Sequence, residues 1–433
     1  MSDDTSGGVS RRKFLQVGGV AAASALTLAA CSSGGGSGGN GKSGSKAISV
    51  WTWYGNQGMP NNSPLGSEFE KANPGTTVNI RTFGNTNDYS PALAAAIAAG
   101  NTPDIYAPSF SAISYGQQGV ALDLRKALGD SFLSQFFQSD NDQFTSNGKQ
   151  YGLGWNAQSF GLFYDPAQLS KVGVEPPETW ADLIAVAPKL KAAGLIPLSM
   201  SANPSYGLSD FVAPLITQAS DDPTLLLKID AQEDGKTWND DAVVAALDKF
   251  QSLVKGGVFG AGLLAVTYAT GEQLLTTGKT AFLWDGSWVP NDLEASSPTF
   301  KYGVAQNPAW ESGAKHWTGD QAGAALSVSA KSPNLDEALS FIKFIFEPAR
   351  YSATLNAAQA MPATKAAAAT VSNPQVKIMT SWLLDGLGAP HILYGPGSET
   401  GLSNACVAIV QGKTTPKEAA ASIQATVNEA LKR

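Results

Sequence analysis

The chain has 433 residues, 43% of them hydrophobic and 15% charged, which is typical of a globular protein with enough chain for two lobes or more. The net charge of -7 and the lack of a long basic run argue against nucleic acid as a partner. Beyond the N-terminal segment no apolar run is long enough to span a bilayer.

The N-terminal segment has the pattern of an export and anchoring signal. Arg11 and Arg12 precede a short Gly/Ala-rich apolar run, which resembles a twin-arginine export signal. The run ends in Leu-Ala-Ala-Cys at Cys31, which resembles a bacterial lipobox. These resemblances imply a signal peptide over residues 1–30, then a lipidated cysteine and a flexible Gly/Ser linker over residues 31–47. We therefore expect an extracytoplasmic protein, anchored through Cys31 to the outer face of the cytoplasmic membrane.

The stretch after the linker alternates strands and helices. Runs of β-branched and aromatic residues, helix stop signals and an amphipathic Ala-rich run predict the order strand, helix, strand, helix, strand. These elements are Ile48–Trp53, Leu65–Ala72, Thr77–Phe83, Tyr89–Ala99 and Asp104–Ala107. This alternation predicts a largely parallel sheet, in which ligands favour the carboxyl edge of the strands.

The segment Asn147–Leu169 is predicted to be the place where the chain passes between lobes. Two short apolar runs, Tyr151–Trp155 and Phe160–Tyr164, are separated by the polar residues Asn156 and Gln158. Glycines weaken the first run as an ordinary strand. We interpret Trp155 and Asn156 as the crossing point from one lobe to the other.

Beyond the crossing the pattern again alternates. The sequence Thr179-Trp180-Ala181-Asp182 predicts a capping box at the start of a helix that ends near Ala193, and Thr415 is predicted to cap the final helix. The other predicted helices are Ala167–Lys171, Asn239–Lys255, Thr270–Thr277 and Asn334–Phe346. The predicted strands are Leu195–Met200, Thr280–Trp284, Tyr302–Ala305 and Gly323–Ser329.

Several of these stretches together resemble the extracytoplasmic solute-binding proteins of carbohydrate ABC transporters, in the maltose-binding-like group (family 1). Each stretch is weak alone, but their order and spacing cover nearly the whole chain after residue 47. They are ISVWTW, ALAAAIAAGNTPDIY, NGKQYGLGWNAQSFGLFYDPAQLSKVGVEPPETWADL, GEQLLTTGKTAFLWDGSW, YGVAQNPA and DQAGAALSVSAKSPNLDEALSFIKFIF.

The resemblance implies an α/β fold of the type II periplasmic-binding-protein kind, with two hinged lobes and a ligand cleft between them. It places lobe 1 at residues 48–156 plus 323–370 and lobe 2 at residues 157–322 plus 371–433. It implies a monomer that captures a mono- or oligosaccharide and delivers it to ABC permease subunits, without a cofactor and without catalysis.

A sugar site needs aromatic plates for the apolar faces of the sugar and short polar groups for its hydroxyls. Several tryptophans fall at predicted strand ends, and Trp317 is one of them. Trp284 lies within a strand instead and is expected in the core. The resemblance supports Trp155, Asn156, Trp288 and Asp320 most. The predicted ligand-binding residues are Trp53, Tyr54, Ser109, Phe110, Trp155, Asn156, Asp285, Ser287, Trp288, Asp320, Gln321 and Tyr394.

Asp320 has two open interpretations. A carboxylate accepts hydrogen bonds from two hydroxyls well. The related proteins more often have a small residue at this position, commonly glycine, so a salt bridge at the hinge is the alternative.

Metal and thiol chemistry is not expected. The residues Asp230–Asp241 echo a calcium-binding loop, but the glutamine and aspartate at its third and twelfth positions are poor ligands, and a surface turn is preferred. The two histidines and the lack of HExxH or CxxC argue against catalytic zinc. Cys406 lies in an apolar helical run and is expected to be buried and unpaired.

Two other functions stay open from the sequence. A secreted glycoside hydrolase would use two carboxylates, for which Asp285 and Asp320 are the candidates, although no spacing requires it. The same fold could instead bind a polyamine or a glycerol-phosphate-like solute. Those ligands need several carboxylates or basic residues at the strand ends, and the sequence favours a sugar.

Overall fold

The computed structural model describes residues 46–53, 59, 63–84, 86–108, 111–393 and 395–432. The strands are β1 (Lys46–Thr52), β2 (Thr76–Thr82), β3 (Ile105–Tyr106), β4 (Thr145–Ser146), β5 (Lys149–Gln150), β6 (Leu153–Tyr164), β7 (Ile196–Met200), β8 (Thr280–Gly286), β9 (Gly303–Ala305), β10 (Thr318–Val328), β11 (Met361–Pro362) and β12 (Gly388–Pro390).

The helices lie between these strands and after them. They are α1 (Pro64–Ala72), α2 (Thr86–Ala98), α3 (Ala112–Gln117), α4 (Leu124–Leu128), α5 (Asp130–Leu133), α6 (Gln138–Asp142), α7 (Pro166–Val172), α8 (Trp180–Ala192), α9 (Tyr206–Ser220), α10 (Leu225–Ala231), α11 (Asp241–Lys255), η1 (Leu263–Ala265), α12 (Tyr268–Thr276), α13 (Val289–Ser296), α14 (Leu335–Ile345), α15 (Pro348–Ala357), α16 (Lys365–Ala368), α17 (Pro374–Leu384), α18 (Ser398–Val410) and α19 (Pro416–Ala430). Among the described helices, none combines the length and the apolar character that crossing a membrane requires.

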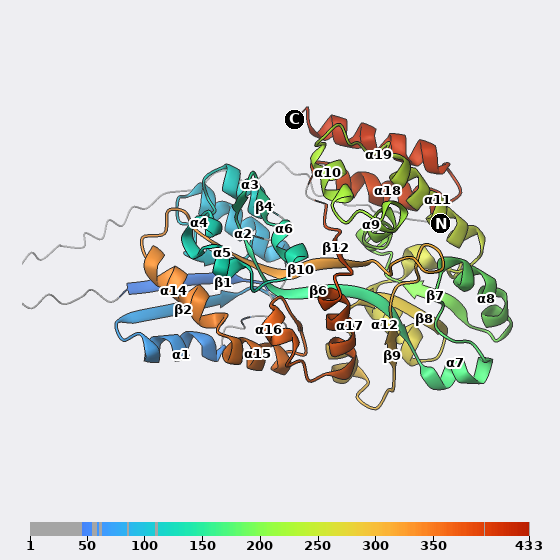
Figure 1. The fold of residues 1–433 in the computed structure, drawn as a ribbon, viewed down its shortest axis with the longest axis horizontal. Coiled ribbons are helices and arrows are strands. Elements are labelled where there is room, and N and C mark those ends of the chain that lie inside the picture. Colours follow the sequence, from blue (N-terminus) through green and yellow to red (C-terminus); the bar gives the residue numbers. More distant parts are fainter. Residues whose placement is uncertain are drawn as a thin grey trace, which may run out of the picture. The chain divides into compact units, whose positions relative to one another are not determined.

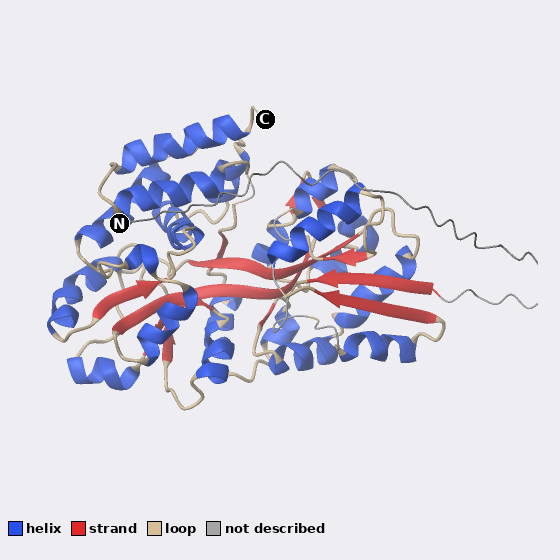
Figure 2. Ribbon diagram, turned by 180° about the vertical axis from the view of Figure 1, so that it is seen from behind, coloured by secondary structure: helices blue, strands red, loops and turns tan. Residues whose placement is uncertain are grey.

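The main sheet has the strand order β2-β1-β3-β10-β6-β8-β7 (Figure 1). The pairs β1–β2, β1–β3 and β7–β8 are parallel, whereas β10 pairs in antiparallel fashion with β3 and β6, and β6 does so with β8. Helices lie along both faces of the strands (Figure 2). The predicted parallel pairing of the first strands is therefore confirmed, and it ends where β10 enters the sheet.

The crossing region differs from its prediction. The two apolar runs form one continuous strand, β6, because the polar residues between them are paired rather than looped out. Asn156 is opposite Ala324 of β10 on one side and Pro362 of β11 on the other. The strand predicted to begin at Gly323 also begins earlier, so that Asp320 and Gln321 lie within β10 and not in a loop.

Strand β6 contributes side chains to three hydrophobic cores. The first core packs β1, β3, α1, α14 and the end of β10, and it receives Trp155. The second core packs β7, α8, α9, α11, α18 and α19, and it receives Phe160 and Leu162. The third core packs α12, α13 and α17, and it receives Ala157 and Phe163. The lobe boundaries given by the resemblance stay a prediction.

Helix capping follows the sequence closely. Thr179 and Asp182 form the predicted capping box of α8, and Thr415 and Glu418 form another at the start of α19. Each pair satisfies two backbone N–H groups that a helix start leaves without partners. Asn334, predicted to cap α14, instead donates its side chain to the carbonyl of Ala47 at 2.9 Å.

The hydroxyl of Tyr351 connects α15 to β6, and its removal gives a first test of the packing. It donates to the carbonyl of Trp155 and accepts from the N–H of Ala363 at 2.9 Å, all in the buried interior. We expect Tyr351→Phe to lower the free energy of unfolding by about 1–3 kcal/mol, because two buried backbone groups lose their partner. Urea unfolding measures this, and Tyr164→Phe, on a half-buried tyrosine with no described hydrogen bond, serves as the control.

Candidate functional site

The carboxyl ends of the parallel strands are the natural place to look for a ligand. Strand β1 ends before Trp53, β3 before Ala107 and Pro108, β7 before Ser201, and β8 before Ser287. Trp53 and Trp288 are half-buried, so each keeps part of its ring accessible. These two tryptophans are the predicted aromatic residues that the structure leaves available at described strand ends.

Trp288 is held at the end of β8 by aromatic contacts. Its ring meets Phe160 edge-on at 5.5 Å between centroids and Tyr268 at 5.7 Å. It folds over Gly286 so closely that a Cβ at that position would lie 2.2 Å from the indole. Only glycine therefore allows this position of the ring. A half-exposed indole beside a half-exposed phenol can contact the apolar face of a sugar ring.

Tyr268 is a candidate that the sequence interpretation did not include. Helix α12 is joined to β8 by a tight turn and runs antiparallel to that strand. Tyr268, the first residue of α12, therefore lies near the carboxyl end of β8. That connection is visible in the sequence, where a predicted helix and a buried strand are separated by Gly278 and Lys279. An aromatic residue at the first turn of such a helix was the signal that could have identified it.

Asp285 and Ser287 are buried rather than exposed to a ligand, in contrast to their prediction. Asp285 accepts a hydrogen bond from the N–H of Gly286 at 2.8 Å. Burial raises the pKa of its carboxyl well above the usual value, and the nearby charges of Glu272 and Asp292 raise it further. Ser287 exchanges backbone and side-chain hydrogen bonds with Ser159 of β6, at 2.9 and 3.4 Å. In this structure both residues support the strand end.

Gln321 and Gln158 lie opposite each other on β10 and β6. The amide of Gln321 donates to the side-chain oxygen of Gln158, and Gln321 stays half-exposed. The side chain of Gln158 covers Gly323, where an added Cβ would lie 2.2 Å from it. Gln321 is thus a predicted site residue with an accessible amide, and Gln158 is a partner that the prediction did not include.

Trp155 and Asn156 are buried in this structure, whereas the sequence predicts that they contact a ligand. The Trp155 indole is fully buried and meets Phe346 and Tyr351 edge-on at 5.6 and 5.3 Å. Asn156 is 1% exposed. The reason is that α15 and β11, distant in the sequence, cover this part of β6.

Asp320 is also fully buried, so it does not present its carboxylate to a ligand at the strand ends. It accepts a hydrogen bond from Ser139 of α6. Burial raises the pKa of Asp320 to about 7, although the Ser139 hydrogen bond opposes the shift. Among the described residues no Lys or Arg forms an ion pair with it, so a salt bridge is not observed either.

Several predicted residues lie outside the part of the chain that the structure describes. They are Arg11, Arg12, Cys31, Tyr54, Ser109, Phe110 and Tyr394. Trp284, predicted to lie in the core, and Trp317, one of the tryptophans at predicted strand ends, are both within the described residues. Trp284 stacks on Phe160 at 4.6 Å in the second core, as expected for a core residue. Trp317 is buried too, and its indole N–H donates to Asp221 at 2.7 Å.

The loop that echoes a calcium site is a turn held by hydrogen bonds. Gln232 and Asp234 adopt positive φ angles of 56° and 53°, and Asp230 accepts from the N–H of Gly395 at 2.8 Å. Within the described residues no group of three or more His, Cys, Asp or Glu side chains could hold a metal ion. Cys406 is a free, buried cysteine, as predicted.

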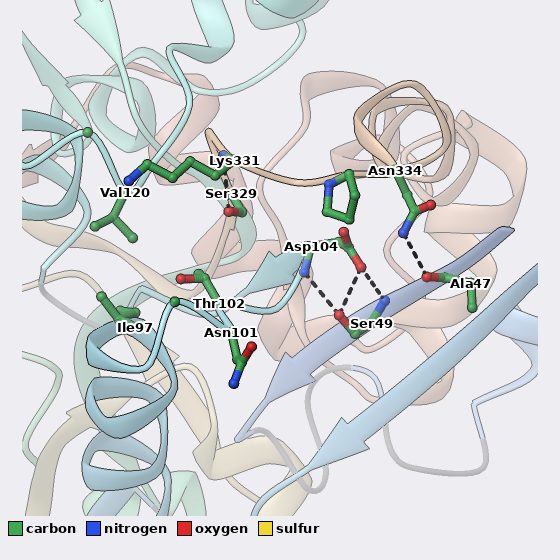
Figure 3. Close-up of a pocket in the computed structure, with 13 residues that line it drawn as sticks. Ala47, Ser49, Ile97, Asn101, Thr102, Asp104, Val120, Ser329, Lys331 and Asn334 are labelled. Atoms are coloured by element: carbon green, nitrogen blue, oxygen red, sulfur yellow. Dashed lines mark hydrogen bonds between the residues drawn. The ribbon is translucent and has the colours of Figure 1, made fainter.

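Two cavities lie away from the strand ends discussed above. One, of about 430 Å³, is at the amino ends of β1 and β3 (Figure 3). Asp104 in its wall accepts from the N–H and hydroxyl of Ser49 at 2.8 and 2.9 Å and from Ser332 at 2.5 Å, so this acid is already satisfied. The other cavity, of about 330 Å³, lies beside α6 and β12, and Ser139 and Gly388 are in its wall.

Comparison with known proteins places this architecture in one family. Residues 62–350 match the family described as bacterial extracellular solute-binding protein. A putative binding protein of Brucella abortus (strain 2308) is 26% identical over 379 residues, which is 83% of this chain and 88% of the relative. The melibiose/raffinose/stachyose-binding protein MelE of Bacillus subtilis (strain 168) is 25% identical over 296 residues, 66% of each chain.

Solved structures agree with the fold. The cyclic α-maltosyl-1,6-maltose binding protein of Arthrobacter globiformis superimposes with a TM-score of 0.75 at 19% identity, covering 89% of this chain and 99% of that protein. This confirms the predicted α/β two-lobe fold of the maltose-binding-like group. The family model that matches residues 62–350 confirms the prediction of a binding protein and not an enzyme. The chain therefore belongs to the family of bacterial extracellular solute-binding proteins.

Proposed function

We propose that this protein captures a mono- or oligosaccharide outside the cytoplasm and delivers it to an ABC importer. The observation that carries the proposal is the aromatic pair at the carboxyl end of β8, where half-exposed Trp288 lies edge-on to half-exposed Tyr268 at 5.7 Å. Such rings suit the apolar faces of sugars, and the amide of Gln321 suits a hydroxyl. Relatives named as sugar-binding proteins support the same ligand class.

The proposed ligand-binding residues follow from accessibility. Trp53, Trp288 and Gln321 are retained from the sequence prediction, and Tyr268 is added. Tyr54, Ser109, Phe110 and Tyr394 stay proposals from the sequence alone, because they lie outside the described residues. The capture step is lobe closure around the sugar, with no covalent chemistry.

Delivery requires that the protein stays near its importer. Arg11 and Arg12 support export, and Cys31 supports a lipid anchor on the outer face of the membrane. The Gly/Ser linker up to residue 47 would leave the binding unit free to reach permease subunits as a monomer. Mass spectrometry of the mature protein tests this: a diacylglyceryl group on Cys31 is expected, and an unmodified N-terminus upstream of Cys31 contradicts it.

The ligand class is tested by calorimetric titration of residues 44–433, which form one compact unit. The panel runs from hexoses through α- and β-linked disaccharides to short oligomers, with spermidine and glycerol phosphate as controls. Saturable binding of one sugar class, with the sugar recovered unchanged, is the expected result. Binding of a control alone, with every sugar silent, would reject the carbohydrate assignment and leave the family unchanged.

A further inference from the structure

Helix α6 and the residue after it contact strand β10 where, on the side away from β6, no strand pairs with it. β12 pairs with β10 up to Asp320, and β3 pairs with it only from Ser327 onward. In the gap, the buried side chain of Gln143 donates to the carbonyl of Asp320 and accepts from the N–H of Ala322, each at 3.2 Å. The carboxamide thus replaces a strand along this edge.

Helix α6 also places a second buried carboxyl group at this contact, because Asp140 follows Ser139, which bonds to Asp320. Asp140 of α6 and Asp320 of β10, the "acid pair" below, are both fully buried. Ser139 donates to one oxygen of Asp320, while the other oxygen of Asp320 and both oxygens of Asp140 have no hydrogen-bond partner among the described residues. Two ionised carboxylates cannot be held this way at low cost, because each is desolvated and each repels the other.

The surroundings of the acid pair offer it no cation. From α15, the Tyr351 hydroxyl is hydrogen-bonded to Trp155 and Ala363. Burial raises the pKa of this hydroxyl, and the charge of Asp140 raises it further. From the segment after β12, the ring of His391 packs against Gly319, and burial lowers the pKa of that ring to about 4, so it is neutral.

Other charged groups on α6 face elsewhere. Burial raises the pKa of Asp142, although a hydrogen bond from Gln138 and the charge of Arg125 oppose the shift. Lys365, across the 330 Å³ cavity, donates to the carbonyl of Ser134. On β6, Gly154 packs against Asp140: a Cβ added at Gly154 would lie 3.4 Å from the carboxyl carbon of Asp140. Gly154 brings no charge to the acid pair.

We propose that the acid pair holds one proton and that this proton stabilises the contact between α6 and β10. Loss of the proton weakens this contact, and the arrangement of the two lobes then depends on external pH. β10 is the connection concerned: Leu326 and Val328 lie in the first core, while Thr318 bonds to Phe160 of the second. The contact between α6 and β10 is therefore stable at acid pH, where the proton is bound, and weakens as pH rises and the proton is lost.

The 330 Å³ cavity lies beside the acid pair, with Ser139 and Gly388 between it and Asp320. Ser139 and Gly388 line the 330 Å³ cavity, and both contact Asp320: Ser139 through its hydroxyl, and Gly388 so closely that a Cβ there would lie 3.0 Å from the carboxylate. Burial raises the pKa of Asp140 well above its ordinary value and that of Asp320 to about 7, which puts release of the proton in the neutral to alkaline range. For one proton, the equilibrium between the stable and the weakened contact changes about tenfold per pH unit above the pKa.

The test measures lobe arrangement without a sugar, so it is independent of the proposed ligand. Residues 44–433 carry Ser67→Cys on α1 and Ser170→Cys on α7, both exposed, for spin labelling, while Cys406 is buried. Pulsed electron paramagnetic resonance records the distance distribution at pH 5.5, 7.0 and 8.5. We expect the distribution to change between pH 5.5 and 8.5 in the otherwise native protein.

Asp140→Asn and, separately, Asp320→Asn are the decisive variants, because an amide needs no added proton to sit beside the remaining carboxyl. Each is expected to lose the pH response, while Asp248→Asn, on an exposed acid of α11, keeps it. An unchanged distribution in the native protein overturns the proposal, even if the thermal midpoint varies with pH. A pH response that persists in whichever asparagine variant folds also overturns it.

Discussion

Replacing Trp155 with alanine is expected to lower the free energy of unfolding by about 3–5 kcal/mol, with no direct loss of a ligand contact. The indole is fully buried in the first core between Phe346 and Tyr351. Its removal deletes apolar contacts and leaves a cavity that β6, paired on both sides, cannot collapse to fill.

Urea unfolding of residues 44–433 measures the change, followed by far-ultraviolet circular dichroism so that the lost tryptophan does not alter the signal. Trp310→Ala is the matched control, because Trp310 is only half-buried, with the Nζ of Lys249 4.3 Å from the centroid of its ring. A Trp155→Ala protein that unfolds like the native one but no longer binds sugar would contradict the buried position. It would restore the original sequence interpretation of this residue.

Much of the fold was accessible from the sequence because its signals are local. Capping boxes at Thr179 and Thr415, the amphipathic stripe of α11 and the β-branched run of β1 each reflect contacts within a few residues. The parallel pairing of β1, β2 and β3 follows from the helices that connect them. These features do not depend on what the distant parts of the chain do.

The site was harder to predict from the sequence, because contacts between distant segments decide which of its residues are buried and which are exposed. Trp155 and Trp288 look alike in sequence, each next to a small polar residue near a strand end. α15, about two hundred residues later, covers Trp155. Gly286 has no Cβ, so the ring of Trp288 can lie against it and stay half-exposed. No periodicity within β6 could reveal that cover.

The acids show the same limit. Asp320 was predicted to accept hydrogen bonds from sugar hydroxyls because carboxylates do this well, and Asp285 was among the predicted ligand-binding residues. The structure buries both and raises the pKa of each carboxyl, so their role is internal. Asp140, which follows the Ser139 that bonds to Asp320, drew no attention in the sequence because it is one polar residue in the polar run of α6.

Replacing Trp288 with alanine is expected to weaken binding of the sugar found by titration about 10- to 100-fold, equivalent to about 1.4–2.8 kcal/mol. The free energy of unfolding should fall less than in Trp155→Ala, because Trp288 is only half-buried. Gly286→Ala provides an independent route to the same result. Its methyl group would lie 2.2 Å from the indole and must displace it, while every ring atom stays present.

Trp288→Ala removes the indole, whereas Gly286→Ala only displaces it, so together the two variants show whether its position matters for binding. If Trp288 stacks on the sugar, both variants weaken binding, and Trp310→Ala, which removes another half-buried indole of the second core region, leaves the dissociation constant unchanged. If Trp288→Ala binds sugar as the native protein does, the aromatic pair with Tyr268 is not the ligand contact. The sugar site would then have to be sought near Trp53, on the other side of the β6–β10 junction.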